Sequence, residues 1–314
     1  MTKIHSGIAK SVMVSGVLAI AGCGGGSDSQ SDLLPGNQTG FVSLGVSDGP
    51  VQDATKVCVA FDGIEVKGVG NDPITFEFDT VENINLLDFQ GTNAAPLLTR
   101  EEVPAGRYEW VRLGVNAVRG GNGGVGDTGD ECVGEESYIV MSDGMAYNLF
   151  VPSGEQNGLR LVSGFTVPAN GSIDATAEWD LAKAVTAPPG LSPDVILKPT
   201  IRLVDNVEAG TLSGVVASEL AGAAECAPSV YLFNDGVTPN PILDGEDDEL
   251  DPVATAIVQE QMNTDGSTSY FYEIGFLLAD DYEAAFTCDG ETFVPEDGKP
   301  ASIAAQQTTT VDFP

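Results

Sequence analysis

Hydrophobic and polar side chains alternate with a period of two along several short segments of this chain. In the segment KVCVAFDGIEV, Val57, Val59 and Phe61 share one face, and Cys58 and Ala60 share the other. Such segments are also rich in branched and aromatic residues, as is typical of β-strands. We therefore predict strands at residues 41–47, 56–66, 74–79, 108–115 and 137–141.

Turn-forming residues separate these segments. They are Asp48-Gly49-Pro50, Pro104-Ala105-Gly106, Asn157-Gly158 and Asn170-Gly171. Asn-Gly is a preferred two-residue hairpin loop because both positions adopt positive φ. One short helix is predicted around residues 179–185. The pattern as a whole predicts an all-β fold of the sandwich class.

The alternation resumes beyond residue 207, where IRLVDN ends one strand and TLSGVV begins another. Further strands are predicted at residues 228–234, 254–261, 270–277 and 282–288, with a threonine-rich end at 308–313. A chain of 314 residues has room for about two domains. We therefore predict two β-sandwich domains, at residues 41–207 and 208–314.

One stretch of the first predicted domain departs from the strand pattern. Residues 116–136 are glycine-rich and acidic, and they are unusually long for a loop of a compact domain. Loops of this length are either functional or mobile.

The N-terminal segment has the features of an export signal. Lys3 and Lys10 precede a short apolar run at residues 12–21, which is too short to span a bilayer. The run ends in Ile20-Ala21-Gly22-Cys23, which resembles the lipobox of bacterial lipoproteins. The resemblance implies that residues 1–22 are a signal peptide and that acyl chains such as palmitate are attached to Cys23. The alternative is an ordinary signal peptide with a chance cysteine.

Residues 23–40 follow as the lipidated cysteine and a Gly/Ser-rich tether. Several acyl chains on one cysteine hold a protein firmly to a membrane. In enterobacteria an aspartate directly after the lipidated cysteine favours retention in the inner membrane. This chain has Gly24 at that position, so by analogy we expect the outer membrane. The chain is thus expected at the cell envelope, facing either the periplasm or the surface.

The charge balance excludes one class of partner. The chain has 47 acidic and 13 basic side chains, a net charge of −34. Such a charge repels phosphate backbones and excludes a nucleic-acid partner. A solvated acidic surface accounts for the excess, and a surface that binds calcium is the alternative.

The histidine content limits the available chemistry. His5 is the only histidine, and it is removed with the signal peptide. Ser-His-Asp and Cys-His catalysis, and any site with a histidine metal ligand, are therefore excluded within the mature chain.

The four cysteines beyond Cys23 form an even set, which usually pairs in an exported protein. Three pairings are open, and we predict Cys58–Cys132 and Cys226–Cys288 because each pair stays inside one predicted domain. A zinc site with four cysteine ligands is the alternative, although the chain lacks the CxxC spacing of such sites.

Ser153, in the stretch VPSGEQNGLRL, lies between Pro152 and Gly154 as in a nucleophile elbow. Strands are predicted on both sides and no histidine follows, so a turn is the better interpretation. A Ser–Lys pair stays formally open. A hydrolase built from two carboxylates is also not excluded, although no acidic pair stands out by its spacing.

Two arginines are candidate ligand-binding residues because bases are so scarce. Arg107 and Arg160 could each clamp an anionic ligand through the guanidinium group, and pairing with a neighbouring carboxylate is the alternative.

The segment DGEDDELDP is the candidate calcium site, because calcium takes six to eight oxygen ligands and relieves repulsion between clustered carboxylates. It does not match an EF-hand loop, and a solvated acidic loop is the alternative. The candidate ligands are Asp244, Glu246, Asp247, Asp248 and Asp251.

Residues 41–205 resemble the bacterial lipoprotein domain DUF4382. The resemblance rests on GFVSLGVSDGPV, VCVAFDGIEV, INLLDF, VPAGRYEWVRLGV, VPSGEQNGLRLVSGFTV and VILKPTIRLV, which occur in the order expected for that domain. The chain departs from the pattern in the glycine-rich stretch and in AEWDLAKAV. The domain has no established activity, so the resemblance implies a fold and a location.

Residues 209–314 resemble the small prealbumin-like or carboxypeptidase-regulatory-like sandwiches, through GTLSGVV and FLLADDYEAAFTC. Modules of this kind usually act as spacers or as contact units for carbohydrate or protein, which implies no catalysis. We therefore expect a non-enzymatic lipoprotein that presents a binding or adhesion surface to a polysaccharide or protein, without a cofactor unless calcium assists. The alternative is a structural subunit of an envelope assembly.

Overall fold

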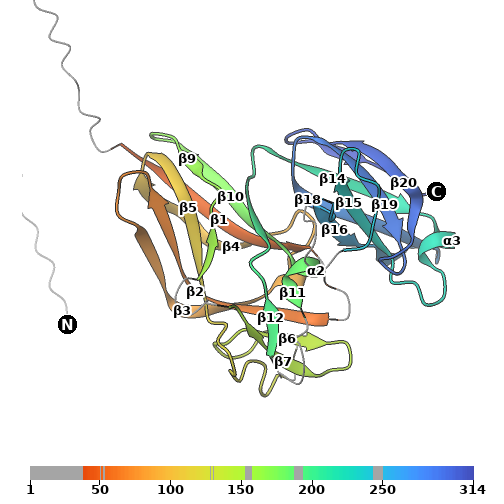
Figure 1. Ribbon diagram of the computed structural model, residues 1–314, viewed down its shortest axis with the longest axis horizontal. Coiled ribbons are helices and arrows are strands. Elements are labelled where there is room, and N and C mark those ends of the chain that lie inside the picture. Colours follow the sequence, from red (N-terminus) through yellow and green to blue (C-terminus); the bar gives the residue numbers. More distant parts are fainter. Residues whose placement is uncertain are drawn as a thin grey trace, which may run out of the picture. The chain divides into compact units, whose positions relative to one another are not determined.

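The computed structural model describes residues 38–49, 51, 54–127, 129, 131–152, 158–186, 194–242 and 250–314 (Figure 1). Strands make up about 58% and helices about 4% of the structure, with several sheets and no closed barrel, which confirms the predicted all-β sandwich class. Among the described residues, no helix is long and apolar enough to cross a membrane.

Two sheets form what we call the first sandwich. Its smaller sheet has the strand order β13-β10-β1-β4, with β1 and β10 parallel and the other pairs antiparallel. These strands are β1 (Thr39–Gly49), β4 (Ala95–Pro104), β10 (Ser172–Asp180) and β13 (Ile201–Asp205).

The larger sheet of the first sandwich has the order β11-β12-β7-β6-β2-β5-β8, and β3 and β9 pair with β2 and β5. The 3₁₀ turn η1 (Leu86–Asp88) and the short helix α2 (Leu181–Ala184) connect strands of the first sandwich. The strands of this sheet are β2 (Ala54–Gly68), β3 (Ile74–Asn85), β5 (Gly106–Val115), β6 (Tyr138–Met141), β7 (Ala146–Phe150), β8 (Leu159–Leu161), β9 (Phe165–Val167), β11 (Val185–Thr186) and β12 (Asp194–Leu197).

Two four-stranded sheets form the second sandwich, with the orders β17-β18-β14-β21 and β16-β15-β19-β20. Helix α3 (Ser218–Ala221) follows β14. The strands are β14 (Ala209–Val216), β15 (Ser229–Asn234), β16 (Ala254–Ile257), β17 (Gln259–Met262), β18 (Thr268–Leu278), β19 (Asp281–Thr287), β20 (Phe293–Ser302) and β21 (Thr308–Thr310).

The period of two accounts for both cores. Val42, Leu44 and Val46 of β1 are buried in the first core, and Leu212 and Ile274 are buried in the second. Each core fills the space between two sheets, as alternation along half-buried strands requires. By their contacts, residues 37–314 form one compact unit, and the predicted domain boundaries stay a prediction.

Strand β2 is buried on both faces, which alternation alone would not predict. Val57, Val59 and Phe61 lie in the core, and Cys58 and Ala60 on the other face are equally buried. The glycine-rich stretch covers this second face: Cys132 forms a disulfide with Cys58, and the Asn116 N–H donates to the Ala60 carbonyl at 2.8 Å. The described part of the long insertion is therefore a cover for a central strand.

A buried ion pair holds this cover in place. Lys56 Nζ donates to both carboxylate oxygens of Asp127, at 2.7 and 2.8 Å, and to the Gly129 carbonyl at 2.6 Å. Burial raises the pKa of Tyr138 to about 12, so its hydroxyl stays protonated and donates to Asp127 at 2.8 Å. Burial would raise the pKa of Asp127, but hydrogen bonds from Lys56 and Tyr138 outweigh it and lower that pKa.

Both predicted disulfides are confirmed. Cys58–Cys132 joins β2 to the cover, and Cys226–Cys288 joins the segment before β15 to the end of β19. The alternative of a zinc site made from these four cysteines is therefore wrong, because all four sulfurs are bonded in pairs.

Three local predictions need correction. The predicted helix at 179–185 is limited to Leu181–Ala184, because Trp179 continues β10 beside β1 and Val185 begins β11. The predicted strand at 254–261 is two strands of different sheets, because buried Val258 lies in the core where the chain crosses between them. Asn170-Gly171 is a turn, but it joins β9 and β10 of different sheets and so makes no hairpin.

Candidate functional site

The two candidate arginines lie on the larger sheet of the first sandwich, and neither has a carboxylate partner among the described residues. Arg160 on β8 stacks over the ring of Trp110, with its Cζ 4.6 Å from the ring centroid. Arg112 stacks on the same ring at 4.9 Å and pairs with Glu65 at 2.7 Å. Arg107 lies on β5 with its side chain exposed, so the structure does not bring the two arginines into one anion site.

The candidate calcium ligands are mostly outside the described residues. Asp244, Glu246, Asp247 and Asp248 fall there, and Asp251 is buried with its Oδ2 3.9 Å from Lys183 Nζ. The described part of the chain contains no group of three or more His, Cys, Asp or Glu side chains arranged to hold a metal ion. Calcium binding by this segment therefore stays a prediction.

Two further sequence candidates also lie outside the described residues. Cys23, the predicted lipid anchor, lies before the first described residue, and Ser153 lies between β7 and β8 in a segment that the structure does not describe. Lipidation and the turn at Ser153 stay predictions.

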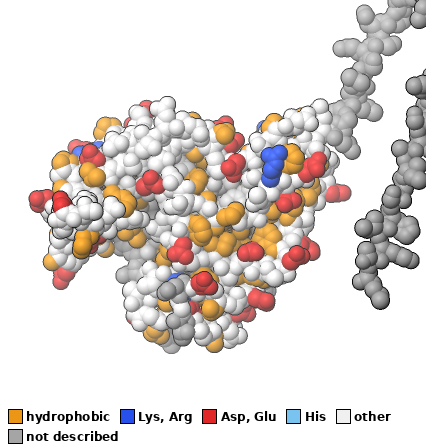
Figure 2. Space-filling model, turned by 180° about the vertical axis from the view of Figure 1, so that it is seen from behind, with side chains coloured by type: hydrophobic (Ala, Val, Ile, Leu, Met, Phe, Trp, Pro, Cys, Tyr) orange, Lys and Arg blue, Asp and Glu red, His pale blue; other side chains and the backbone are white. Residues whose placement is uncertain are grey.

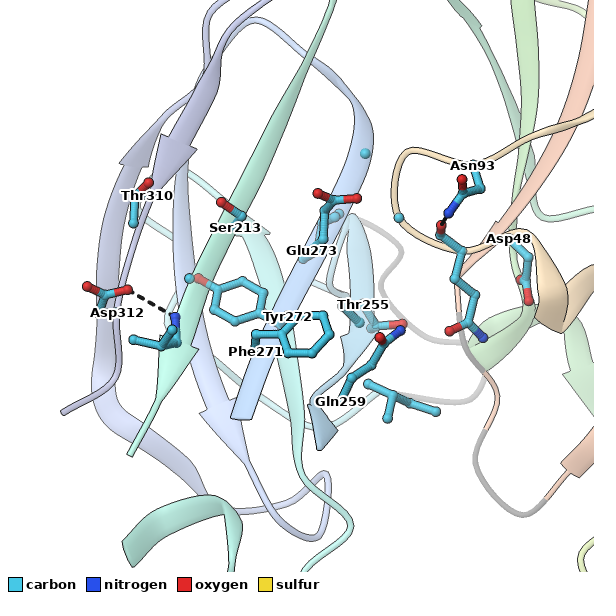
Figure 3. Close-up of a pocket in the computed structure, with 18 of the residues that line it drawn as sticks. Asp48, Asn93, Ser213, Thr255, Gln259, Phe271, Tyr272, Glu273, Thr310 and Asp312 are labelled. Atoms are coloured by element: carbon cyan, nitrogen blue, oxygen red, sulfur yellow. Dashed lines mark hydrogen bonds between the residues drawn. The ribbon is translucent and has the colours of Figure 1, made fainter. Parts of the chain in front are cut away.

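The structure points instead to a cavity of about 470 Å³ over one sheet of the second sandwich (Figure 3). Its floor is the outer face of the sheet β17-β18-β14-β21, because the alternate side chains of these strands point into the core. The outward side chains that line it are Gln259, Phe271, Glu273, Ser213, Val215 and Thr310, with Asp312 just beyond β21.

Strand register sets the order of these side chains. Glu273 lies opposite Ser213, and Ser213 opposite Thr310, so they form one row across three strands. Phe271 lies between Gln259 and Val215 in the neighbouring row. Figure 3 shows Glu273 and Asp312 on opposite sides of Ser213. Asp312 is held there because its Oδ1 accepts a hydrogen bond from the Val215 N–H at 3.0 Å.

The segment at residues 90–93 of the first sandwich closes one side of the cavity. Thr92 donates to Glu273 Oε1 from its backbone N–H at 3.1 Å and from its hydroxyl at 2.9 Å. Gly275 has to be a glycine, since a Cβ there would lie 2.2 Å from the Gly91 carbonyl oxygen. Asn93 and Gln90 from the same segment also line the cavity.

A cluster of buried acids lies behind this wall. Asp48 at the end of β1 pairs in register with Trp179, which places it beside Glu178 and Asp180 of β10. Glu178 forms an ion pair with Arg202, and Asp180 Oδ2 is 3.8 Å from Lys183 Nζ. Asp48 is only 3% exposed, and within the described chain neither of its carboxylate oxygens accepts a hydrogen bond of standard geometry.

Burial shifts the acidity of this cluster. It raises the pKa of Asp48 well above its usual value, repulsion from Asp180 adds to the rise, and the Leu181 N–H counteracts it only in part. Burial also raises the pKa of Asp180 to about 6, against the opposing effect of Lys183. Asp180 therefore takes up a proton near pH 6, where ordinary aspartates are ionised, and Asp48 is protonated more readily than an ordinary aspartate.

We expect the protein to gain stability as the pH falls from 8 to about 5. In that range the folded state binds a proton at Asp180 that the unfolded chain does not bind, so acidification favours folding. The raised pKa of buried Asp48 acts in the same direction. For Asp180 the gain is on the order of 2–3 kcal/mol. It should end near pH 4, and lower pH should cost stability as Asp127, whose pKa is lowered, becomes protonated.

Urea unfolding at several pH values measures this dependence. Asp48→Asn should stabilise the protein at pH 8 and flatten the curve, whereas Asp297→Asn, an exposed acid of β20, should do neither. Equal effects of the two substitutions would show that the overall negative charge of the protein, and not the buried cluster, determines how its stability depends on pH.

The chemical character of the cavity follows from its lining. Its charged side chains are the four acids Asp48, Glu178, Glu273 and Asp312, and no Lys, Arg, His or Cys is among the lining residues described. The Thr255 hydroxyl lines it as well and has no partner within the described chain. Figure 2 shows acidic side chains spread over one face of the molecule, where basic ones are few. The cavity therefore offers hydrogen-bond acceptors, hydroxyls and the outward ring of Phe271 to a ligand.

Sequence reasoning missed this site. Asp48 belongs to a predicted turn, and Glu273 to a predicted strand. The sequence offers two weak signals, the polar Thr211 and Ser213 in one predicted strand and the single acid Glu273 in the otherwise uncharged stretch 270–277. They could not identify a site, because register and the neighbouring sandwich decide which of these positions meet.

Comparison with known proteins gives one clear family match. No curated protein matches the sequence. Two of the solved structures that resemble this one are a minor pilin of Streptococcus agalactiae and a candidate cell adhesion protein of Bacteroides fragilis. The pilin is 14% identical, with 86% of this chain and 94% of that chain covered at a TM-score of 0.19. The Bacteroides protein is 9% identical, with 87% and 92% covered at a TM-score of 0.20.

At such TM-scores we draw nothing about function from these structures. The profile described as "Domain of unknown function (DUF4382)" matches residues 39–199, which is just over half of the chain. The resemblance of the C-terminal part to prealbumin-like modules stays a prediction. The chain belongs to the DUF4382 family.

Proposed function

We propose that this protein is a non-catalytic binding protein of the cell envelope, held by lipid on Cys23, and that its cavity face binds a polysaccharide. The observation that carries the proposal is the row arrangement of Glu273, Ser213 and Thr310 beside Phe271 on one sheet face. Sugar hydroxyls both donate and accept hydrogen bonds, and the C–H face of a sugar ring packs on an aromatic ring. Concave sites that combine apolar surface with a few polar groups are typical of ligand binding.

The chemistry of the cavity supports binding without catalysis. The described lining side chains include no histidine or lysine that could activate Ser213 or Thr310 as a nucleophile. Glu273 lies on β18 and Asp312 just beyond β21, two strands away across the sheet, so their Cα atoms are about 10–12 Å apart. In a glycosidase the two carboxyl groups face one bond from either side. Glu273 and Asp312 instead lie on opposite sides of Ser213 and bind different neighbours, Thr92 and the Val215 N–H, which fits two contacts along an extended ligand.

The full chain with Cys23→Ser tests the proposal. This variant should leave the membrane fraction, because it lacks the predicted acylation site, and it is then a soluble probe for a panel of immobilised polysaccharides. We expect it to retain at least one polysaccharide and to release no reducing ends from it. Phe271→Ala should weaken retention about tenfold, which corresponds to the loss of one buried aromatic contact of about 1.4 kcal/mol.

Phe78→Ala is the matched control, since Phe78 is a half-buried phenylalanine that lines a different groove on the first sandwich. Equal loss of binding in both variants would place the site elsewhere. Retention of envelope proteins but of no polysaccharide would assign the surface to a protein partner, and release of sugar would overturn the non-catalytic assignment.

A further inference from the structure

We propose that the ligand of this cavity is an oligosaccharide with free amino groups, bound as ammonium ions by Glu273 and Asp312. The inference rests on the proposed function and names the chemistry of its ligand. It starts from the charges of the lining: four carboxylic acids and no basic side chain among the described residues. An anionic ligand is therefore repelled, and a cationic one is attracted.

Glu273 and Asp312 are the two acids available to such a ligand. Glu178 is neutralised by Arg202, and Asp48 is buried with a raised pKa. Glu273 and Asp312 are exposed, and no cation pairs with either carboxylate in the described chain. Lys299 donates to the backbone carbonyl of Asp312 at 2.6 Å but forms no ion pair with its carboxylate.

In both Glu273 and Asp312, one carboxylate oxygen accepts hydrogen bonds from the protein and the other remains available to a ligand. The Thr92 hydroxyl and N–H both donate to Glu273 Oε1, and the Val215 N–H donates to Asp312 Oδ1. Within the described residues, Glu273 Oε2 and Asp312 Oδ2 accept no hydrogen bond. These contacts also fix the two carboxylates in place, which reduces the entropy lost on binding.

The groups between the two acids indicate a saccharide. Ser213 and Thr310 present hydroxyls in the row that begins at Glu273, and Phe271 presents its ring one row away. The Cα atoms of the two acids are about 10–12 Å apart, and their carboxylates are held by different neighbours on opposite sides of Ser213, so we expect each to take its own amine. An oligomer with repeated amino groups can satisfy both acids and place its hydroxyls over Ser213 and Thr310.

A second observation supports a ligand at this place. Thr255 and Asp48 line the cavity and are nine-tenths or more buried. The Thr255 hydroxyl has no hydrogen-bond partner in the described chain, and the two Asp48 carboxylate oxygens accept no hydrogen bond of standard geometry there. Buried polar groups are nearly always hydrogen-bonded in native proteins. A ligand or its bridging waters with hydrogen-bond donors would satisfy these acceptors.

Calorimetry with the full chain tests the inference with three probes: glucosamine oligomers, the same oligomers after N-acetylation, and a lysine peptide of equal charge. We expect the glucosamine oligomers to bind, and acetylation to weaken binding more than tenfold because it removes the positive charge. Glu273→Gln and Asp312→Asn should each weaken binding about five- to tenfold, because each removes the negative charge and keeps one of the two acceptor oxygens. Binding should also weaken as the salt concentration rises.

Glu260→Gln is the control, because Glu260 is an exposed acid on β17 of the same sheet but does not line the cavity. Equal binding of acetylated oligomers would overturn the ammonium requirement and leave the proposed polysaccharide function intact. Tighter binding of the lysine peptide would overturn the saccharide and assign the two acids to a protein. A failure of all three probes, and of neutral polysaccharides as well, would overturn the proposed function itself.

Discussion

Replacing Trp179 with alanine should lower the free energy of unfolding by about 3–5 kcal/mol. Trp179 is fully buried in the core of the first sandwich, near the end of β10 where it pairs with β1, and its ring lies 6.4 Å from that of Phe61 on the opposite sheet. Removing it leaves a cavity between the two sheets that neither can close by moving alone. Its indole N–H has no hydrogen-bond partner in the described chain, so the loss is one of packing.

Urea unfolding followed by circular dichroism measures the effect. Trp110 is the control, because it is the only other tryptophan and faces outward under Arg112 and Arg160. Its replacement by alanine should cost less than half as much, since two flexible arginine side chains can close over the gap. A Trp179→Ala protein as stable as the parent would contradict the placement of this residue in the core.

Removing the Cys58–Cys132 disulfide should cost about 4 kcal/mol. The bond closes a loop with a sequence separation of 74 residues, and losing it raises the entropy of the unfolded chain by the amount expected for a loop of that length. Cys58→Ala with Cys132→Ala also releases the cover from β2. Hydrogen exchange should then quicken at Val133, whose N–H is bonded to the Tyr138 hydroxyl.

The second disulfide is the matched control. Cys226–Cys288 has a sequence separation of 62 residues, so its removal should cost a similar amount. It should leave exchange at Val133 unchanged, because it lies in the other sandwich. Fast exchange at Val133 in both variants would mean that the cover depends on the whole fold and not on its own disulfide.

The alternation of side chains determined the fold class without any tertiary information. Strands with a period of two and glycine or proline turns between them can bury their apolar faces only by stacking sheets. The sequence also predicted the two disulfides. An even number of cysteines in an exported chain usually forms disulfides, and pairing within each predicted domain gave Cys58–Cys132 and Cys226–Cys288. Both predictions hold in the structure.

Some local predictions failed where the tertiary structure overrides the pattern. Residues 254–261 read as one strand, but Val258 fills the core between two sheets and the chain crosses there. The glycine-rich stretch carries no strand pattern, yet Lys56 and Cys58 bind it to β2. Both outcomes depend on partners far away in the sequence, which periodicity does not encode.

The candidate site was decided by the tertiary structure alone. Ser213, Glu273 and Thr310 are separated by up to 97 positions in the numbering, and only the pairing of β14 with β18 and β21 places them in one row. Asp48 meets Glu178 and Asp180 because β1 and β10 are parallel. The sequence by itself determined the strands, the turns, the cysteine pairing and the excess of acid. Strand register and the apposition of the two sandwiches, which depend on long-range packing, decided which of those acids line one cavity.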